Sequence, residues 1–248
     1  MLLAIDIGNT NISFGIFKNQ KIIKKFDASS KNYSLKKIKA KLQNFIIEDI
    51  IICSVAPAAT DALKKDLGKL FKKTPLIVGK DIFAPVKNMY RFPQQVGQDR
   101  LVNALAGIKL HKAPLIVIDF GTAITFDVIN KKNVYLGGMI LPGFSISLDA
   151  LANKTALLPK IKLSEPKELI GRDTKNSILS GIVFGTAALT DNLTEKIKKK
   201  IGQNAKIVAT GSSASLIAKY CKKINIVDKE LTLKGLKLIY EIFVKNNA

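Results

Sequence analysis

Two segments of this 248-residue chain place a carboxylate and a glycine beside small polar side chains, each directly after an apolar run. They are Asp6-Ile7-Gly8-Asn9-Thr10-Asn11 and Asp119-Phe120-Gly121-Thr122. Glycine lets a backbone approach a ligand closely, Asn and Thr supply hydrogen-bond donors, and a carboxylate can hold a cation or its bound water. A single copy would be better explained as an ordinary hairpin turn, since Asp, Gly and Asn are common turn residues. Two copies favour a phosphate-binding role.

The common nucleotide-binding motifs are missing from this sequence. No two of its 16 glycines are separated by a single residue, which excludes Gly-x-Gly-x-x-Gly, and no Gly-x-x-x-x-Gly-Lys-Ser/Thr segment occurs. A bound nucleotide would therefore depend on the two Asp-x-Gly turns.

A third segment, Val96-Gly97-Gln98-Asp99-Arg100, comes immediately before a predicted helix. Asp99 can act as a general base, Gly97 leaves room for a substrate, and Arg100 can contact an anion. The alternative is that Asp99 caps the helix while Arg100 lies in solvent. The chain has three arginines, Arg91, Arg100 and Arg172, which favours a role for Arg100 that lysine does not fill.

The composition excludes several kinds of site. The chain has 40 basic and 19 acidic residues, and its net charge of +21 suggests nucleic acid as a partner. Almost all of the basic residues are scattered lysines, so we interpret the excess as a solvated surface and expect no nucleic-acid partner. The single histidine, His111, argues against triad chemistry and multi-histidine metal sites, and Cys53 and Cys221 are expected to be reduced, buried thiols.

The apolar runs are too short to cross a bilayer, and the first residues lack the basic leader of a secretory signal. We therefore expect a cytoplasmic protein without a membrane segment.

The hydrophobic pattern predicts two series of strands and helices. The first has strands at residues 2–7, 12–17, 21–26, 49–54 and 75–78, with helices near 35–45 and after Pro57. A loop-rich segment, 81–98, and a helix at 100–111 follow. The second series has strands at 115–119, 124–129, 134–140, 206–209 and 224–227, a long helix from about 174 to 200, and a final helix at 229–244.

The two series contain an internal repeat. Residues 5–10 align with 118–122, and residues 12–16 align with 124–128. A repeated strand, Asp-x-Gly turn and strand predicts two similar α/β domains that face a central cleft, with both turns directed at it. We expect residues 1–112 to form the first domain, with the first turn and the Gly-x-Asp-Arg segment, and residues 113–248 to form the second.

Together these segments resemble the type III pantothenate kinase family, in the superfamily of acetate and sugar kinases and actin. The matching motifs are Asp6-x-Gly-Asn-Thr-Asn, Tyr90-x-x-Pro-x-x-Val-Gly-x-Asp-Arg, Asp119-x-Gly-Thr-Ala-x-Thr, Gly137-Gly-x-Ile-x-Pro-Gly, Gly171-x-x-Thr with Ser180-Gly, and Ala209-Thr-Gly. The resemblance implies two actin-like (ribonuclease H-like) domains. It also implies transfer of the ATP γ-phosphoryl group to pantothenate, which gives 4'-phosphopantothenate in the first step of coenzyme A biosynthesis.

The resemblance further implies roles for single residues. The first ATP-binding loop would contain Asp6, Ile7, Gly8, Asn9, Thr10, Asn11, Ile12 and Ser13, with Asp6 near the Mg²⁺, and Thr122 would be a further ATP contact. Asp99 would be the proton acceptor, in a pantothenate site with Tyr90, Gly97, Gln98, Arg100 and Thr174. Asp119 would hold a monovalent cation, K⁺ or NH₄⁺. Thr174 would reach across the interface of a homodimer.

Two positions depart from the family pattern. Ser212-Ser213 follows Gly211 where a second glycine is usual, which bears on the adenine contacts, and Gln98 stands where a smaller residue is usual. One side of the long helix carries Ile178, Ile182, Gly185, Leu189 and Ile197, which fits core packing and a dimer surface equally well.

Two other functions stay open from the sequence. One is another small-molecule kinase of the same superfamily, and the other is a non-catalytic regulatory relative that binds nucleic acid. The carboxylates Asp6, Asp99 and Asp119 argue against the second.

Overall fold

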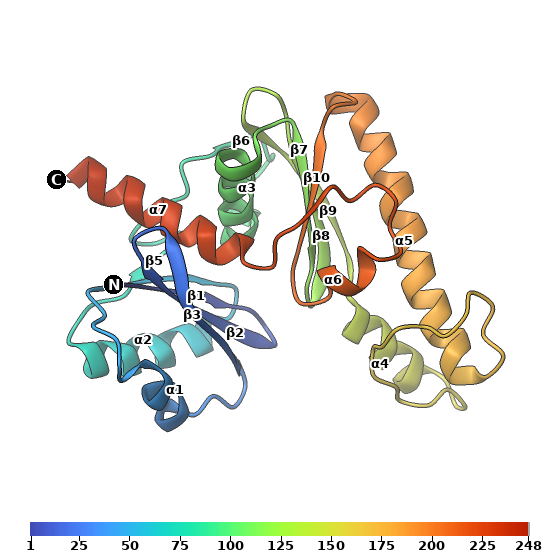
Figure 1. Ribbon diagram of the computed structural model, residues 1–248, viewed down its shortest axis with the longest axis horizontal. Helices are drawn as coiled ribbons and strands as arrows, with labels where there is room; N and C mark the ends of the chain where they lie inside the picture. The colour runs from blue at the N-terminus through green and yellow to red at the C-terminus, as the bar shows by residue number, and fades with distance from the viewer. Residues whose placement is uncertain (248) are drawn as a thin grey trace. The chain divides into compact units, whose positions relative to one another are not determined.

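The computed structural model describes residues 1–247, which form two compact α/β units (Figure 1). Unit 1 consists of residues 1–86, residues 91–106 and the C-terminal segment from Glu230. Unit 2 consists of residues 87–90 and 107–229. Each unit has one mixed sheet with helices packed against it, so the α/β class expected from the sequence is confirmed.

The sheet of unit 1 has the strand order β3-β2-β1-β4-β5. These strands are β1 (Leu2–Ile7), β2 (Asn11–Lys18), β3 (Lys21–Ser29), β4 (Asp49–Ser54) and β5 (Leu76–Ile77). Strand β1 pairs with β2 in antiparallel orientation and with β4 in parallel orientation, so that Asp6 lies opposite both Ser13 and Cys53.

Helices cover both faces of this sheet, which explains the nearly continuous apolar run of β1. On one face, Leu3 and Ile5 belong to a core that includes side chains of α1 (Leu35–Leu42) and α2 (Pro57–Phe71). On the other, Leu2 and Ala4 pack in a core with α3 (Gln98–His111) and α7 (Leu231–Asn247). Side chains alternate along a strand, so Asp6 projects to the same face as Leu2 and Ala4.

The sheet of unit 2 has the strand order β11-β10-β7-β8-β9-β6. These strands are β6 (Lys87–Asn88), β7 (Leu115–Phe120), β8 (Ala123–Ile129), β9 (Val134–Pro142), β10 (Lys206–Thr210) and β11 (Ile226–Val227). A buried cluster joins one face of β7 and β8 to three helices: α4 (Phe144–Lys154), α5 (Thr174–Ile201) and α6 (Ala214–Ile217). A short 3-10 helix, η1 (Pro93–Gln95), lies in the loop-rich segment before α3.

The internal repeat found in the sequence is present in the two sheets. The order β3-β2-β1-β4-β5 in unit 1 corresponds to β9-β8-β7-β10-β11 in unit 2. The first three strands are antiparallel neighbours in each case, and the remaining pairs are parallel. Strands β1 and β7 therefore occupy equivalent positions, and each ends in an Asp-x-Gly turn.

The units differ from the expected division at residue 112 in one main respect. The final helix, α7, belongs to unit 1, because its buried side chains Leu233, Leu236 and Ile239 pack in the same core as β1 and β4. A single cut of the chain cannot describe this arrangement, since the C-terminal helix packs against the first strands.

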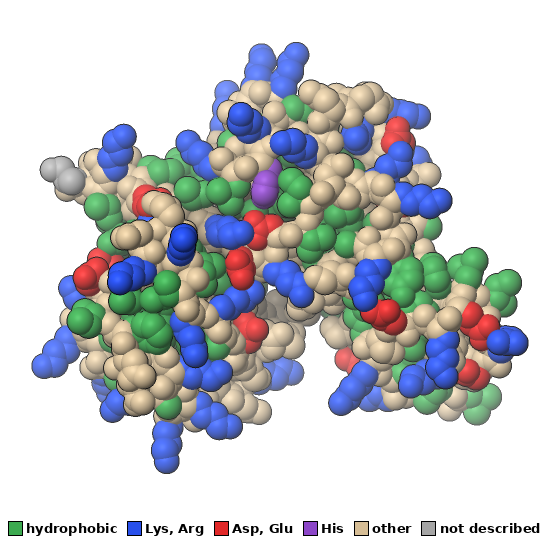
Figure 2. Space-filling model, in the orientation of Figure 1, with side chains coloured by type: hydrophobic (Ala, Val, Ile, Leu, Met, Phe, Trp, Pro, Cys, Tyr) green, Lys and Arg blue, Asp and Glu red, His purple; other side chains and the backbone are tan. Residues whose placement is uncertain are grey.

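The surface agrees with the interpretation of the charge as solvated lysines. On the face shown in Figure 2, lysine and arginine side chains are scattered over both units. No helix within residues 1–247 is long and apolar enough to cross a membrane.

Candidate active site

The first Asp-x-Gly turn joins β1 to β2 at the edge of unit 1. The Gly8 N–H donates to the Asn11 carbonyl at 2.9 Å, and Ser30 Oγ donates to the Gly8 carbonyl at 2.6 Å. Asn9, Thr10 and Asn11 are exposed. The hydrogen bond from Ser30, the residue after β3, thus holds the backbone of the turn in place. The exposed side chains of the turn are accessible to a phosphate group.

The hydroxyl of Ser13 has a partner that the sequence did not indicate. Ser13 lies opposite Asp6 in the β1–β2 pair, and its Oγ donates to Asp27 Oδ1 at 2.7 Å. Asp27 comes from β3, at the register position facing Ser13. The position of Asp27 follows from strand pairing alone, and no local motif marks it.

Asp99 lies in the first turn of α3, since the helix begins at Gln98. Its Oδ1 accepts the Arg100 N–H at 2.9 Å. Burial raises the pKa of this carboxyl, and its hydrogen bond and charge interaction with Arg100 oppose that rise. Although part of the residue reaches solvent, the carboxylate itself is poorly hydrated, so it is a stronger proton acceptor than an exposed aspartate.

The residue before α3 must be glycine for this geometry. An ideal Cβ at Gly97 would lie 2.4 Å from Asp99 Oδ1, which is far inside van der Waals contact. Gly97 therefore leaves the space that the Asp99 carboxylate occupies.

The buried thiol of Cys53 lies near both Asp6 and Asp99. The thiol is fully buried, and burial raises its pKa well above the ordinary value. The carboxylates of Asp6 and Asp99 raise it further, because a thiolate beside them would be repelled. Both carboxylates therefore lie near the same thiol, on the face of the β1–β4 pair that α3 covers.

The side chain of Gln98 packs against the loop after β5. Gly79 has a φ of +87°, and an ideal Cβ there would lie 2.6 Å from Gln98 Cγ. A larger residue at position 98 is accommodated because position 79 has no side chain. Arg100, in contrast, is 6% exposed, so the alternative with Arg100 in solvent is wrong.

The second Asp-x-Gly turn, in unit 2, is surrounded by glycines. Ideal Cβ atoms would lie 3.1 Å from Asp119 Oδ1 at Gly121 and 2.3 Å from it at Gly211. At Gly143 the Cβ would lie 2.2 Å from the Thr122 carbonyl. At these glycines the backbone therefore comes close to the Asp119 carboxylate and to the Thr122 carbonyl, and oxygen donors of this kind suit a hard cation.

The remaining predicted residues of unit 2 are Tyr90 and Thr174. The Tyr90 ring lies over Gly137, where an ideal Cβ would be 3.5 Å from Tyr90 Cδ2. Thr174 is exposed at the start of α5, directly after Asp173, whose Oδ1 caps the helix by accepting the Asn176 N–H at 2.9 Å. Tyr90, Asp119, Thr122 and Thr174 thus belong to unit 2, and Asp6–Ser13 and Gly97–Arg100 to unit 1.

Sequence reasoning missed a buried group on β8. Asp127 is fully buried, and Tyr135 Oη donates to its Oδ1 at 2.9 Å. The available signal was a carboxylate inside an otherwise apolar strand. Within residues 1–247 no cluster of three His, Cys, Asp or Glu side chains forms a metal site. Mg²⁺ bound to a nucleotide needs fewer protein ligands, since phosphates and water supply the others.

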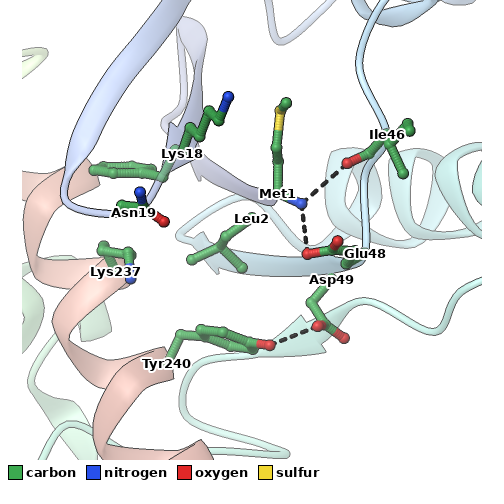
Figure 3. Close-up of a pocket in the computed structure, with 10 residues that line it drawn as sticks. Met1, Leu2, Lys18, Asn19, Ile46, Glu48, Asp49, Lys237 and Tyr240 are labelled. Atoms are coloured by element: carbon green, nitrogen blue, oxygen red, sulfur yellow. Dashed lines mark hydrogen bonds and ion pairs between the residues drawn. The ribbon is translucent and has the colours of Figure 1, made fainter.

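One pocket of about 450 Å³ lies away from these residues (Figure 3). It is at the opposite end of β1 from Asp6 and includes Leu2, Asp49 and Tyr240. Four of its polar groups bond in pairs: Tyr240 Oη donates to Asp49 Oδ2 at 2.5 Å, and the Met1 ammonium group donates to Glu48 Oε2 at 2.6 Å. We therefore assign the candidate site to the Asp6 and Asp99 end.

Comparison with known proteins agrees with this geometry. Residues 2–196 match the family model described as type III pantothenate kinase. A type III pantothenate kinase of Finegoldia magna is 42% identical, over 98% of this chain and 97% of the relative, and that of Citrifermentans bemidjiense is 39% identical, over 97% and 99%.

Solved structures share the fold at low sequence identity. A structure from Campylobacter jejuni, described as a Baf family transcriptional activator, has a TM-score of 0.61 at 23% identity and covers 98% of this chain and 99% of its own. The activator of the 2-hydroxyisocaproyl-CoA dehydratase from Clostridium difficile has a TM-score of 0.57 at 13% identity, covering 99% and 96%. On its family match and its curated relatives, the chain belongs to the type III pantothenate kinase family.

Proposed function

We propose that this protein transfers the γ-phosphoryl group of ATP to the primary hydroxyl of pantothenate, which produces 4'-phosphopantothenate for coenzyme A biosynthesis. The family supports this activity. The observation that carries it at the level of the site is a poorly hydrated Asp99 that, like Asp6, lies near the Cys53 thiol, while the loop after Asp6 has exposed polar side chains.

Asp99 is the proposed proton acceptor. A primary alcohol is a poor nucleophile at neutral pH, and a carboxylate within hydrogen-bond reach can take its proton as the bond to phosphorus forms. Burial raises the pKa of Asp99, which makes its carboxylate a better proton acceptor than an exposed aspartate. Gly97, Gln98 and Arg100 accompany it in the proposed pantothenate site, with Tyr90 and Thr174 as further contacts.

The loop Asp6–Ser13 is the proposed first binding site for the ATP phosphates. Phosphoryl transfer is catalysed mainly by positioning and by neutralising charge, which backbone N–H groups and a divalent metal can supply. Asp6 would lie near the Mg²⁺ that accompanies ATP, and Thr122 would contact the nucleotide from the second turn. Because ATP is the phosphoryl donor, we infer a cytoplasmic location, and nucleic acid has no role in the proposed reaction.

Asp119 is the proposed ligand of a monovalent cation, K⁺ or NH₄⁺. Its carboxylate lies close to the backbone at Gly121 and Gly211, where a Cβ atom would crowd Oδ1. A cation there would supply positive charge close to the second turn.

We also propose a homodimer that uses the outer side of α5. Gly181 and Gly185 are exposed, and no atom lies within 4 Å of an ideal Cβ at either position. Large apolar side chains of the same unit are exposed as well: Ile140 64%, Ile146 45%, Leu169 65% and Ile170 79%. Exposed apolar surface of this extent is typical of protein interfaces.

The proposed reaction is tested by coupled ADP release from purified protein with Mg-ATP and KCl. We expect turnover with pantothenate and none with a panel of sugars and other small alcohols. Turnover with another alcohol but not with pantothenate would assign the protein to a different kinase activity. Salt-dependent DNA binding without any ATP turnover would instead favour a regulatory protein.

A further inference from the structure

Strand β8 carries a buried carboxylate that the proposed reaction does not use. Asp127 is 0% exposed. Tyr135 Oη donates to its Oδ1 at 2.9 Å, and Thr125 Oγ1 donates to its Oδ2 at 3.1 Å. A carboxylate is costly to remove from water, so hydrogen bonds of this kind offset part of its burial. They also give each hydroxyl group a defined direction.

Thr125 lies directly opposite Asp119 in the β7–β8 pair. Residues that face each other in an antiparallel pair project to the same side of the sheet, with Cβ atoms about 4.5–5.5 Å apart. Thr125 and Asp127 are two positions apart on β8 and therefore share that side. The buried cluster with Ile124 and Phe126 occupies the other side, so this face holds a row of three oxygen-bearing side chains.

The direction of the Thr125 hydroxyl determines what it can bind. Its proton is committed to Asp127 Oδ2, so its oxygen presents lone pairs to any further partner. A hydroxyl oxygen that only accepts is a suitable ligand for a hard cation. The facing residue on β7 is Asp119, whose carboxylate oxygens are ligands of the same kind.

We propose that the Thr125 hydroxyl oxygen is a second ligand of the monovalent cation held by Asp119. Asp127 is the positioning residue that orients this hydroxyl, and Tyr135 holds Asp127 from its other oxygen. The inference rests on the cation role proposed above for Asp119. It extends that role to the hydrogen bonds that join Thr125 and Tyr135 to Asp127.

The test compares two substitutions at position 125, one that removes the hydroxyl group and one that keeps it. Thr125→Val removes the oxygen and keeps the β-branched shape, whereas Thr125→Ser keeps the oxygen. Thermal unfolding is measured as KCl replaces choline chloride at constant ionic strength, together with the K⁺ concentration for half-maximal ADP release. We expect Thr125→Ser to retain the K⁺-dependent rise in Tm. Thr125→Val should lose that rise, and its K⁺ concentration for half-maximal ADP release should increase by at least about tenfold.

The positioning step is tested by Asp127→Asn, with Tyr135→Phe as its comparison. An amide offers one acceptor oxygen where the carboxylate offers two, so the substituted side chain cannot accept from both hydroxyls in the same way. We expect a K⁺ requirement raised as in Thr125→Val, and a smaller increase for Tyr135→Phe, which leaves the contact with Thr125 in place.

Equal K⁺ responses in Thr125→Val and Thr125→Ser would overturn the inference. If Asp119→Asn alone abolishes the K⁺ response, the cation proposal stands while the role of Thr125 fails. A protein without any K⁺-dependent rise in Tm overturns both. The Tm measurement needs no pantothenate, so it decides the inference even where the proposed substrate fails.

Discussion

The surroundings of the Asp99 carboxylate are set both by a residue close to it in sequence and by strands far from it in sequence. Gly97 leaves it space two residues away, and its environment also depends on β1 and β4, which carry Asp6 and Cys53. The sequence indicated Asp99 through the Gly-x-Asp-Arg segment. The buried thiol beside both carboxylates follows from strand pairing between residues 47 positions apart, which no local pattern reveals.

Replacing Asp99 by Asn should separate catalysis from stability. Asn keeps the shape but cannot accept a proton, so we expect kcat for pantothenate to fall by about 10²–10⁴-fold. Burial raises the pKa of Asp99 in the folded state, so the ionised group destabilises the protein as pH rises from its ordinary pKa through the raised value. At neutral pH the Tm of Asp99→Asn should therefore equal or exceed that of the unsubstituted protein.

Steady-state kinetics and thermal unfolding at pH 5 and pH 7.5 check both parts. The activity of the unsubstituted protein should decline toward acidic pH as Asp99 becomes protonated. Full activity of Asp99→Asn would contradict the assignment of Asp99 as the base. A Tm of Asp99→Asn below that of the unsubstituted protein at pH 7.5 would show that burial of the ionised carboxylate does not destabilise the fold.

At the scale of elements, the hydrophobic periodicity predicted which strands and helices form, but it did not always predict the sheet against which a helix packs. Strands β1, β2, β7 and β8 and the long helix α5 lie within a few residues of their expected positions, because each has a strong apolar pattern. The apolar stripe of α7 predicted a helix equally well. Its partner strands β1 and β4 lie more than 170 residues earlier in the chain, and nothing in the stripe identifies them.

The packing of α7 in unit 1 depends on a close approach at Gly235. An ideal Cβ there would lie 2.6 Å from the Val102 carbonyl oxygen of α3, and this backbone atom cannot rotate away. We expect Gly235→Ala to destabilise the protein by about 1–3 kcal/mol through overpacking. The Tm should fall by roughly 2–4 °C for each kcal/mol.

Gly68→Ala in α2 provides the matched control for differential scanning fluorimetry. Its Cβ would meet the Lys73 carbonyl at 3.5 Å, an ordinary contact, so the gain in helix propensity should leave the Tm equal or higher. Equal effects of the two substitutions would mean that α7 does not pack closely on α3.

At the scale of the whole molecule, the charge of +21 first suggested nucleic acid. The lysines on the visible face are spread over both units, which fits a solvated surface that also attracts anions such as ATP and pantothenate (Figure 2). The apolar part of the surface is more informative. It gathers on unit 2, around α4 and α5 and the segment between them, where the long helix exposes two glycines.

Gly185→Arg should therefore dissociate the proposed homodimer. Gly185 has no side chain, so two helices can approach closely there. A long, charged arginine at this position would block that approach, and the cost of removing its charge from water would oppose association. Sedimentation velocity should show a mass near twice 27.1 kDa for the unsubstituted protein and near 27.1 kDa for Gly185→Arg. Ala62→Arg, at an exposed position of α2, is the control and should leave the dimer intact. Because Thr174 is proposed to act across the interface, kcat/KM for pantothenate should fall with the dimer fraction, and an active monomer would contradict that role.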